Sequence, residues 1–198
     1  MIRRMQKCDI ERVVAVHLSS FPGFFLSFLG PRFLALYYAG ICSSPEGIGF
    51  VSLNPAGDPA GFVVGTSNPR GFYKTLLKRD GMKFFLASLG FICRKPLIAK
   101  RVARALSYPS KIPTGEELAG LFSIGVMPEM QGNGTGKKLV LEFIKEARRK
   151  GCKKVFLTTD RDHNDNVNAF YQKMGFKIER QYDTPEGRRM NEYWMEIS

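Results

Sequence analysis

The most informative segment of the chain runs from Val126 to Lys138 and reads Val-Met-Pro-Glu-Met-Gln-Gly-Asn-Gly-Thr-Gly-Lys-Lys. It joins a predicted strand over 117–127 to a predicted amphipathic helix over 136–150. Three glycines at alternate positions allow a ligand to approach the backbone closely, and the free N–H groups of a helix N-terminus lie at the positive end of the helix dipole. The segment therefore predicts a loop that binds an anion, such as a diphosphate, through backbone N–H groups.

Two common phosphate-binding motifs do not fit this segment. A Walker A loop requires glycine where Gln131 stands, and serine or threonine where Lys138 stands. A dinucleotide-binding motif GxGxxG that began at Gly132 or Gly134 would place its third glycine at Lys137 or Leu139, respectively. The loop is therefore expected to bind its anion without a Walker A motif or a dinucleotide-binding motif.

Short apolar strands and amphipathic helices alternate on both sides of the loop. The expected elements before it are a weak strand at 2–7, helices at 10–20 and 31–41, and strands at 48–53 and 60–66. Those expected after the helix at 136–150 are a strand at 155–159, a short helix with Val167, Phe170, Tyr171 and Met174 on one face, and strands at 177–182 and 190–197. This order predicts one α/β domain over residues 1–198, built around a single sheet.

Two motifs resemble those of the GCN5-related N-acetyltransferases (GNAT). Gln131-x-x-Gly134-x-Gly136 is similar to the family's motif A, and Asn164, followed seven residues later by Tyr171 and then by Gly175-Phe176, is similar to its second signature. The predicted elements of 1–69 and 114–198 also follow the family's order. The resemblance implies the GNAT fold, a central mixed but mostly antiparallel sheet flanked by helices, with residues 70–113 as an added basic helical insert.

The resemblance also implies that the chain binds acetyl-CoA, or coenzyme A, and transfers the acetyl group to a primary amine. Tyr171 would be the general acid that protonates the departing thiolate, and no metal is implied. The implied cofactor-binding residues are Ile124, Val126, Gln131, Gly132, Asn133, Gly134, Thr135, Gly136, Lys137, Asn164 and Tyr171.

Some of these residues have a purely structural alternative. Tyr171 shares an apolar stripe with its neighbours and could simply pack, and Asn164 stands where it could cap the N-terminus of its helix. No general base for the acceptor amine is assigned, because His17 and His163 are interpreted as ordinary polar or partly buried side chains.

The charge of the chain is concentrated in one segment. The 198 residues carry a formal net charge of +12, and residues 70–111 hold eleven basic side chains against one acidic residue, Asp80. This insert packs an ordinary helix on the sheet, contacts an anionic membrane surface, or binds a phosphorylated substrate or nucleic acid. Nucleic acid is disfavoured as a partner, because Phe84 and Phe85 cluster instead of being spaced for base stacking.

No two of the four cysteines form a CxxC pair, so neither a zinc site nor a disulfide framework is predicted. The longest apolar run in the middle of the chain, 84–93, has half of the roughly 20 residues that a membrane-spanning helix needs. We therefore expect a cytoplasmic protein, with peripheral contact at the inner membrane face as an option.

The leading interpretation is N-acetylation of a small molecule that is anionic or an amino sugar. The alternatives are acetylation of a protein or peptide amine, and a non-catalytic basic module that binds a membrane or nucleic acid.

Overall fold

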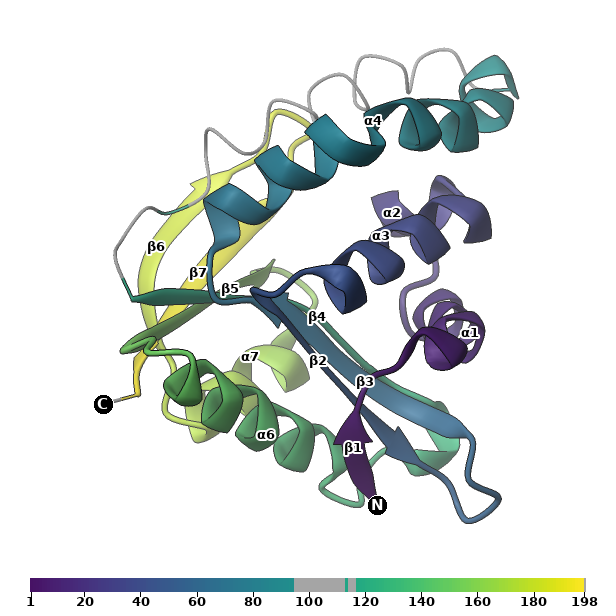
Figure 1. Ribbon diagram of the computed structural model, residues 1–198. Coiled ribbons are helices and arrows are strands. Elements are labelled where there is room, and N and C mark those ends of the chain that lie inside the picture. The colour runs from purple at the N-terminus through teal and green to yellow at the C-terminus, as the bar shows by residue number, and fades with distance from the viewer. Residues whose placement is uncertain (95–112, 114–116, 198) are drawn as a thin grey trace.

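The computed structural model describes residues 1–94, 113 and 117–197 (Figure 1). The basic segment 95–112 lies outside the described residues. The N-terminal half contains β1 (Ile2–Arg4), the 3-10 turn η1 (Lys7–Asp9), α1 (Ile10–Ser20), α2 (Phe25–Phe28), α3 (Pro31–Ser43), β2 (Gly47–Leu53), β3 (Pro59–Thr66) and α4 (Pro69–Arg94). The C-terminal half contains β4 (Leu118–Val126), the 3-10 turn η4 (Pro128–Met130), α6 (Thr135–Arg149), β5 (Lys154–Asp160), α7 (Asp165–Lys173), β6 (Lys177–Asp183) and β7 (Arg189–Glu196).

The strands form one sheet in the order β1-β2-β3-β4-β5-β7-β6. Every neighbouring pair is antiparallel except β4 and β5, which run parallel. The expectation of a mixed, mostly antiparallel sheet flanked by helices is therefore confirmed.

Helices cover both faces of the sheet (Figure 1). One core lies under α6 and α7, where Leu139, Val140 and Phe143 are fully buried against the strands. A second core lies on the opposite face, under α1, α3 and α4, around Leu34 and Tyr38. The described part of the basic insert contributes to this second core, because α4 buries Phe72, Leu76 and Phe84 in it.

The parallel pair β4–β5 is short. Leu118–Gly120 pair with Lys154–Phe156. From Leu121 onward, among the described residues, β4 pairs only with β3 and β5 continues only with β7. The two strands therefore separate toward their C-terminal ends, and the region between 121–126 and 157–160 is called here the β4–β5 opening.

A β-bulge marks the point at which β4 leaves β5. Leu121 lies opposite Gly65, but Ser123 lies opposite Val64, so Phe122 is one residue too many for the register. A bulge bends its strand, increases the local twist and turns side chains to a new direction. Phe122 accordingly packs on the α4 side, against Phe72 and Tyr73, while Ile124 returns to the α6 side.

Candidate active site

The N-terminus of α6 presents a row of free backbone donors. Gly132 and Gly134 have φ values of +77° and +71°, and Gly134 occupies the N-cap position without any side-chain cap. Among the described residues, no acceptor pairs with the N–H groups of 132–137, and the first bonded amide is that of Lys138, which donates to the Gly134 carbonyl at 3.0 Å. Unpaired amides at the positive end of a helix dipole form an anion-binding site.

The space in front of these donors is open. A Cβ atom built on Gly132 or Gly134 would meet no atom within 4 Å, and the loop residues Gln131, Gly132, Asn133 and Gly134 are exposed. The neighbouring Lys137 is exposed as well, whereas Thr135 is buried. The predicted anion-binding residues therefore lie together on one accessible loop.

Gln131 ties this loop to the end of β4. Its Nε2 donates to the Val126 carbonyl at 2.9 Å, and its backbone N–H donates to the Pro128 carbonyl at 3.2 Å. The same Val126 carbonyl is 3.5 Å from the Ser20 hydroxyl, which can donate to it. Gln131 thus holds the loop in place, while the glycine amides that follow it remain available.

Asn164 lies at the N-cap position of α7, but its side chain makes no cap hydrogen bond. The interpretation of its side chain as a helix cap is therefore wrong. Its Nδ2 instead donates to Thr159 Oγ1 at 2.8 Å and to the Asp160 carbonyl at 3.1 Å. The amide turns back because the last carbonyls of β5 need donors where the chain leaves the sheet. Asn164 consequently fixes the end of the strand that borders the opening.

Asn168, which the sequence analysis missed, is the hydrogen-bonding centre of this region. Its Nδ2 lies 3.0 Å from the carbonyls of both Asp160 and Asn164, and its Oδ1 accepts from Asn191 Nδ2 at 2.9 Å and from the Tyr193 hydroxyl at 3.0 Å. An asparagine inside a helix, a poor position for this residue, is the signal that could have identified it.

Tyr171 combines a side chain that packs in the core with a hydroxyl that can donate a proton. Its side chain is only 5% exposed, and its ring contacts the rings of Phe170, Phe176 and Tyr193. Its hydroxyl makes no hydrogen bond to the residues that the structure describes. Burial raises the pKa of this hydroxyl well above its ordinary value, so it stays protonated at neutral pH. A protonated hydroxyl without a protein acceptor is free to donate.

The two motifs lie side by side in the fold. A Cβ built on Gly136, in the first turn of α6, would be 3.7 Å from Phe170 Cζ, in the residue before Tyr171. Figure 1 shows α6 and α7 on the same face of the sheet. Segments about 30 residues apart in the chain therefore meet next to the two strands that separate.

A second group of residues joins the ends of α1 and β5. Arg188, in the turn between β6 and β7, donates from Nε and Nη2 to the two carboxylate oxygens of Asp160 at 2.9 and 2.7 Å. Its guanidinium carbon also lies 5.3 Å from the ring centroid of Phe24, in the segment after α1. This contact brings Phe24 close to the C-terminal end of β5.

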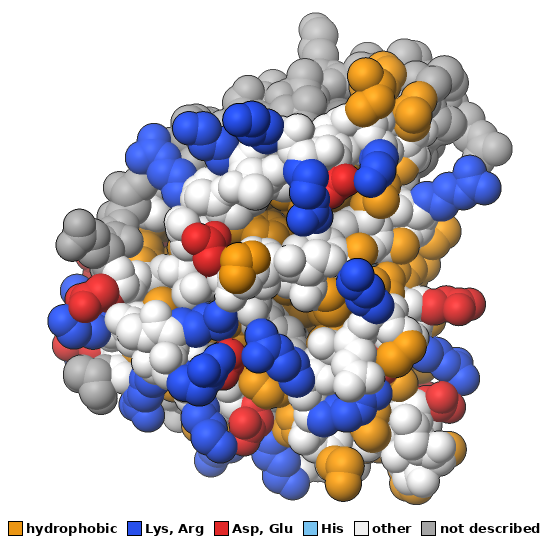
Figure 2. All heavy atoms as spheres, in the orientation of Figure 1, with side chains coloured by type: hydrophobic (Ala, Val, Ile, Leu, Met, Phe, Trp, Pro, Cys, Tyr) orange, Lys and Arg blue, Asp and Glu red, His pale blue; other side chains and the backbone are white. Residues whose placement is uncertain are grey.

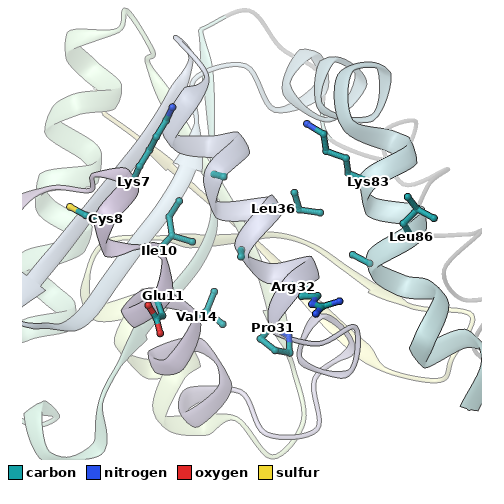
Figure 3. A pocket seen from close by; sticks show the side chains of 13 residues that line it. Lys7, Cys8, Ile10, Glu11, Val14, Pro31, Arg32, Leu36, Lys83 and Leu86 are labelled. Atoms are coloured by element: carbon teal, nitrogen blue, oxygen red, sulfur yellow. The ribbon is translucent and has the colours of Figure 1, made fainter.

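A separate groove of about 1020 Å³ lies between α1, α3 and α4 (Figure 3). Its lining includes the apolar residues Val14, Leu36 and Leu86, and the cations Lys7, Arg32 and Lys83. No residue of the glycine loop, β5 or α7 lines it within the described part of the chain. The groove is therefore distinct from the site at α6 and α7.

Positive charge is spread over the face that carries α4 (Figure 2). Along this helix Met82, Phe85 and Leu86 are exposed beside lysine and arginine side chains. None of the helices that the structure describes is both long and apolar enough to cross a membrane. Within the same residues, no cluster of three histidine, cysteine or acidic side chains is arranged to hold a metal ion.

Curated relatives match only part of the chain. A mycothiol acetyltransferase of Paenarthrobacter aurescens (strain TC1) is 43% identical over 56 residues, which are 28% of this chain and 17% of the relative. A glucosamine 6-phosphate N-acetyltransferase of Trypanosoma brucei brucei is 35% identical over 68 residues, which are 34% of this chain and 44% of the relative. The matches thus span less than half the length of each of these two relatives.

Solved structures match the whole fold. Ard1 from Thermoplasma volcanium superposes with a TM-score of 0.63 and 18% identity, over 100% of this chain and 97% of that chain. The model of the acetyltransferase (GNAT) family matches residues 15–176, which include the glycine loop, Asn164 and Tyr171. The chain therefore belongs to the GNAT acetyltransferase family.

Proposed function

We propose that this protein transfers an acetyl group from acetyl-CoA to the primary amine of a small molecule. The observation that carries the proposal is the row of unpaired N–H groups at 132–137, next to two strands that separate. The membership in the GNAT family and the acetyltransferase names of the partial relatives support the same reaction.

The residues of the chain fit the diphosphate and the arm of coenzyme A. The amides of Gly132, Gly134 and Gly136 would hold the diphosphate, with Lys137 beside it, and Asn164 would hydrogen-bond the arm. The backbone of β4 at Ile124 and Val126 would pair with the arm, because no strand that the structure describes pairs with this edge beyond Gly120. The bound molecule supplies the activated acetyl group.

The chemistry of the transfer requires two further contributions from the protein. A backbone N–H of β4 would stabilise the negative charge that develops on the thioester oxygen when the amine attacks. The Tyr171 hydroxyl would then give its proton to the departing thiolate, as a general acid, while the proton that the amine loses would pass to water and Tyr171 would take a proton back from water. The amine attacks directly, so no covalent intermediate with the enzyme is formed.

The acceptor that we favour is an anionic molecule or an amino sugar. One partial relative is named for glucosamine 6-phosphate, which is both. The excess of basic side chains in this chain is consistent with an anionic acceptor. Acetylation of a peptide amine is the competing enzymatic proposal.

Release of free thiol from acetyl-CoA tests these proposals directly. The panel contains glucosamine, glucosamine 6-phosphate, a nucleotide-linked amino sugar and a peptide with a free N-terminus. We expect turnover with a sugar amine and a preference for the anionic form. Turnover with the peptide alone would support the competing proposal, acetylation of a peptide or protein amine. If none of the amines in the panel gives thiol release, and acetyl-CoA does not stabilise the protein against thermal unfolding, the proposed function is contradicted.

We further propose that the exposed face of α4 contacts an anionic membrane surface. Met82, Phe85 and Leu86 form an apolar patch on this helix, and Lys78 and Lys83 lie beside them. Apolar side chains that insert at a headgroup boundary, flanked by cations, match the chemistry of an anionic bilayer.

Co-sedimentation with vesicles tests the membrane proposal. Vesicles that contain phosphatidylserine should bind the protein, and the double variant Phe85→Ser/Leu86→Ser should weaken the binding at least ~10-fold. The control Leu141→Ser changes a residue of α6 that is also exposed, and should have no effect. Equal binding of the double variant and the wild type would overturn the proposal.

A further inference from the structure

The C-terminal end of β5 carries a charged pair on the face of the sheet opposite α7. The Thr159 side chain lies on the α7 face, because its hydroxyl accepts a hydrogen bond from Asn164. Successive side chains of a strand point to opposite faces, so the Asp160 side chain lies on the face that carries α1. The bonds from Arg188 to Asp160, and the contact of Arg188 with Phe24 after α1, agree with this placement. The pair therefore borders the β4–β5 opening on the side away from α6 and α7.

Arg188 is held in one orientation by its neighbours. Its Nε and Nη2 donate to the two carboxylate oxygens of Asp160 at 2.9 and 2.7 Å, and its guanidinium carbon lies over the Phe24 ring. That ring packs in turn against Phe21, with the two ring centroids 5.5 Å apart. A two-pronged bond to a carboxylate fixes the plane of a guanidinium, and an aromatic ring over one side adds a cation–π contact. The guanidinium is therefore already in place before any ligand binds.

One edge of this guanidinium is unused. A guanidinium carries five N–H groups, and the bonds to Asp160 use only those of Nε and Nη2. Among the residues that the structure describes, none accepts a hydrogen bond from Nη1 of Arg188. The side chain is 36% exposed, so a ligand can reach it. The free edge, formed by Nη1 and Nη2, has the planar geometry that binds two oxygens of a phosphate or a carboxylate.

The charges around Arg188 leave a small positive excess. The nearby residues Arg161 and Arg189 both form ion pairs with Asp162. Three cations therefore accompany two carboxylates, Asp160 and Asp162, at this end of β5 and β7. An anion at the free edge would be attracted by this excess, and it would not have to displace Asp160 from its bonds.

The position of Arg188 fits the acceptor and not the cofactor. The glycine loop and α7, to which the proposed function assigns the diphosphate and the arm of coenzyme A, belong to the opposite face. Along β5, the opening runs from Leu157 to Asp160, which is about 10 Å at ~3.3 Å per residue. An amine that attacks a thioester in the opening would thus lie within the length of one small molecule from Arg188.

We propose that Arg188 binds an anionic group of the acceptor, a phosphate or a carboxylate, through its free Nη1–Nη2 edge. The inference rests on the proposed function, because it names the residue that recognises the acceptor charge in that same site. It makes Arg188 a specificity-determining residue: an amine that carries an anion gains a two-pronged contact, and a neutral amine of the same shape does not.

Pairs of acceptors that differ by one charged group test this assignment. Glucosamine and glucosamine 6-phosphate test a phosphate, and butylamine and 4-aminobutanoate test a carboxylate. Thiol release at saturating acetyl-CoA gives kcat and KM for each acceptor. We expect Arg188→Gln to raise the KM of the anionic member of a pair at least about 10-fold, the effect of losing hydrogen bonds to a charged group. The kcat values and the KM of the neutral member should change less than about 2-fold, because neither depends on this contact.

A second variant guards against a general effect on folding. Arg188→Lys keeps a positive charge beside Asp160 but lacks the planar second edge. Its melting temperature should stay close to that of the wild type, and the KM of the anionic acceptor should still rise, by at least about 5-fold.

The matched control is Arg149→Gln. Arg149 makes the same kind of two-pronged bond, because its Nε and Nη2 donate to Glu146 at 2.7 and 2.8 Å. It is the last residue of α6, about 20 Å from the first turn of that helix at 1.5 Å per residue. The variant removes the same charge, and all KM values should stay within about 2-fold of the wild type.

The possible failures can be told apart. An unchanged KM for the anionic acceptors in Arg188→Gln would overturn the inference. An equal rise for anionic and neutral acceptors would also overturn it, because Arg188 would then only support the structure. Both results leave the acetyl transfer itself intact. If no acceptor gives thiol release and acetyl-CoA does not stabilise the protein, the proposed function fails and this inference fails with it.

Discussion

At the scale of single residues, Tyr171 combines a packed ring with a free hydroxyl. The ring supports the core beside Phe176 and Tyr193, whereas the hydroxyl has no bond within the described structure. Removal of that hydroxyl should therefore leave folding intact and affect only chemistry.

We predict that Tyr171→Phe lowers kcat by about 100-fold, the typical contribution of a general acid. Coenzyme A affinity and the melting temperature should stay within error of the wild type. Steady-state kinetics and thermal unfolding measure these quantities. Tyr193→Phe provides the contrast, because its hydroxyl bonds Asn168 and its loss should lower stability by ~1 kcal/mol. Unchanged turnover in Tyr171→Phe would remove this residue from the chemistry.

His17 makes stability depend on pH. Burial lowers the pKa of His17 from 6.5 to about 4. The unfolded chain therefore binds a proton in the pH range 4–6.5 that the folded chain does not, and stability falls as the pH is lowered through this range.

The prediction is that protonation of His17 in the unfolded chain removes about 3 kcal/mol of the free energy of unfolding between pH 7 and pH 4. Urea unfolding of the wild type and of His17→Gln at several pH values measures this contribution. The wild type should lose the larger amount, and the difference between the two proteins should shrink toward pH 4. Parallel curves for the two proteins would show that His17 does not contribute.

Single residues also show where sequence reasoning stops. The spacing of Tyr171 with Phe170 and Met174 predicts its burial correctly, because packing follows the helical period. The same reasoning left a helix cap open as one role for the Asn164 side chain, but this side chain bonds backward to β5 instead. Asn168 was not identified at all, because its partners lie at the end of β5, at the N-cap of α7 and in β7, and only the folded arrangement brings them together.

At the scale of elements, the loop before α6 depends on glycine at two positions with positive φ. A side chain is strained in this conformation, by roughly 1–2 kcal/mol. The strain alone would not distinguish a binding loop from an ordinary turn. Gly151, which follows the other end of α6, has a φ of +80° and equally open surroundings, and so provides a matched control.

We predict that Gly134→Ala and Gly151→Ala destabilise the protein by a similar amount, about 1 kcal/mol. Only Gly134→Ala should also weaken coenzyme A, by at least about 10-fold, because its Cβ would occupy the space through which the diphosphate reaches the amides. Thermal unfolding and calorimetry of both variants test this. Similar coenzyme A affinities of the two variants would place the diphosphate elsewhere.

Sequence reasoning predicted the elements that nearby residues determine, and it missed elements that are very short or that depend on a neighbouring strand. The helices at α1, α3 and α6 follow from apolar periodicity together with Pro31 and Gly151 at their ends. The four-residue helix α2 is too short for a periodic signal. The bulge of β4 was also missed, because Leu118–Val126 reads as an uninterrupted apolar strand and the extra residue exists only relative to β3.

At the scale of the whole molecule, the sheet consists of two antiparallel parts that share one short parallel seam. Strands β1 to β4 form one part and β5, β7 and β6 the other, and the seam is limited to Leu118–Gly120 with Lys154–Phe156. This strand order and this separation are tertiary properties. The order of strands and helices along the chain predicts one α/β domain around a single sheet, whereas the arrangement of the strands within that sheet follows only from the family resemblance.

A ligand that lies between the two parts should act as the missing strand. Beyond Gly120, β3 is the one described strand that pairs with β4, so the β4 amides that point toward β5 have no partner among the described strands. Pairing with the arm of coenzyme A would protect such amides from exchange with solvent.

We predict that coenzyme A slows hydrogen exchange in three segments, at 121–126, at 132–138 and at 159–171. The intact protein is allowed to exchange and is then rapidly digested, and mass spectrometry measures the exchange in each peptide. Segments of β1 and β2, which lie at the far side of the sheet, should change little. The variant Gly134→Ala should require a higher coenzyme A concentration for the same protection. Protection that is uniform along the chain would indicate only general stabilisation by a bound ligand. Protection at the groove between α1, α3 and α4, without any at 132–138, would place the cofactor in that groove and contradict the assignment of the glycine loop.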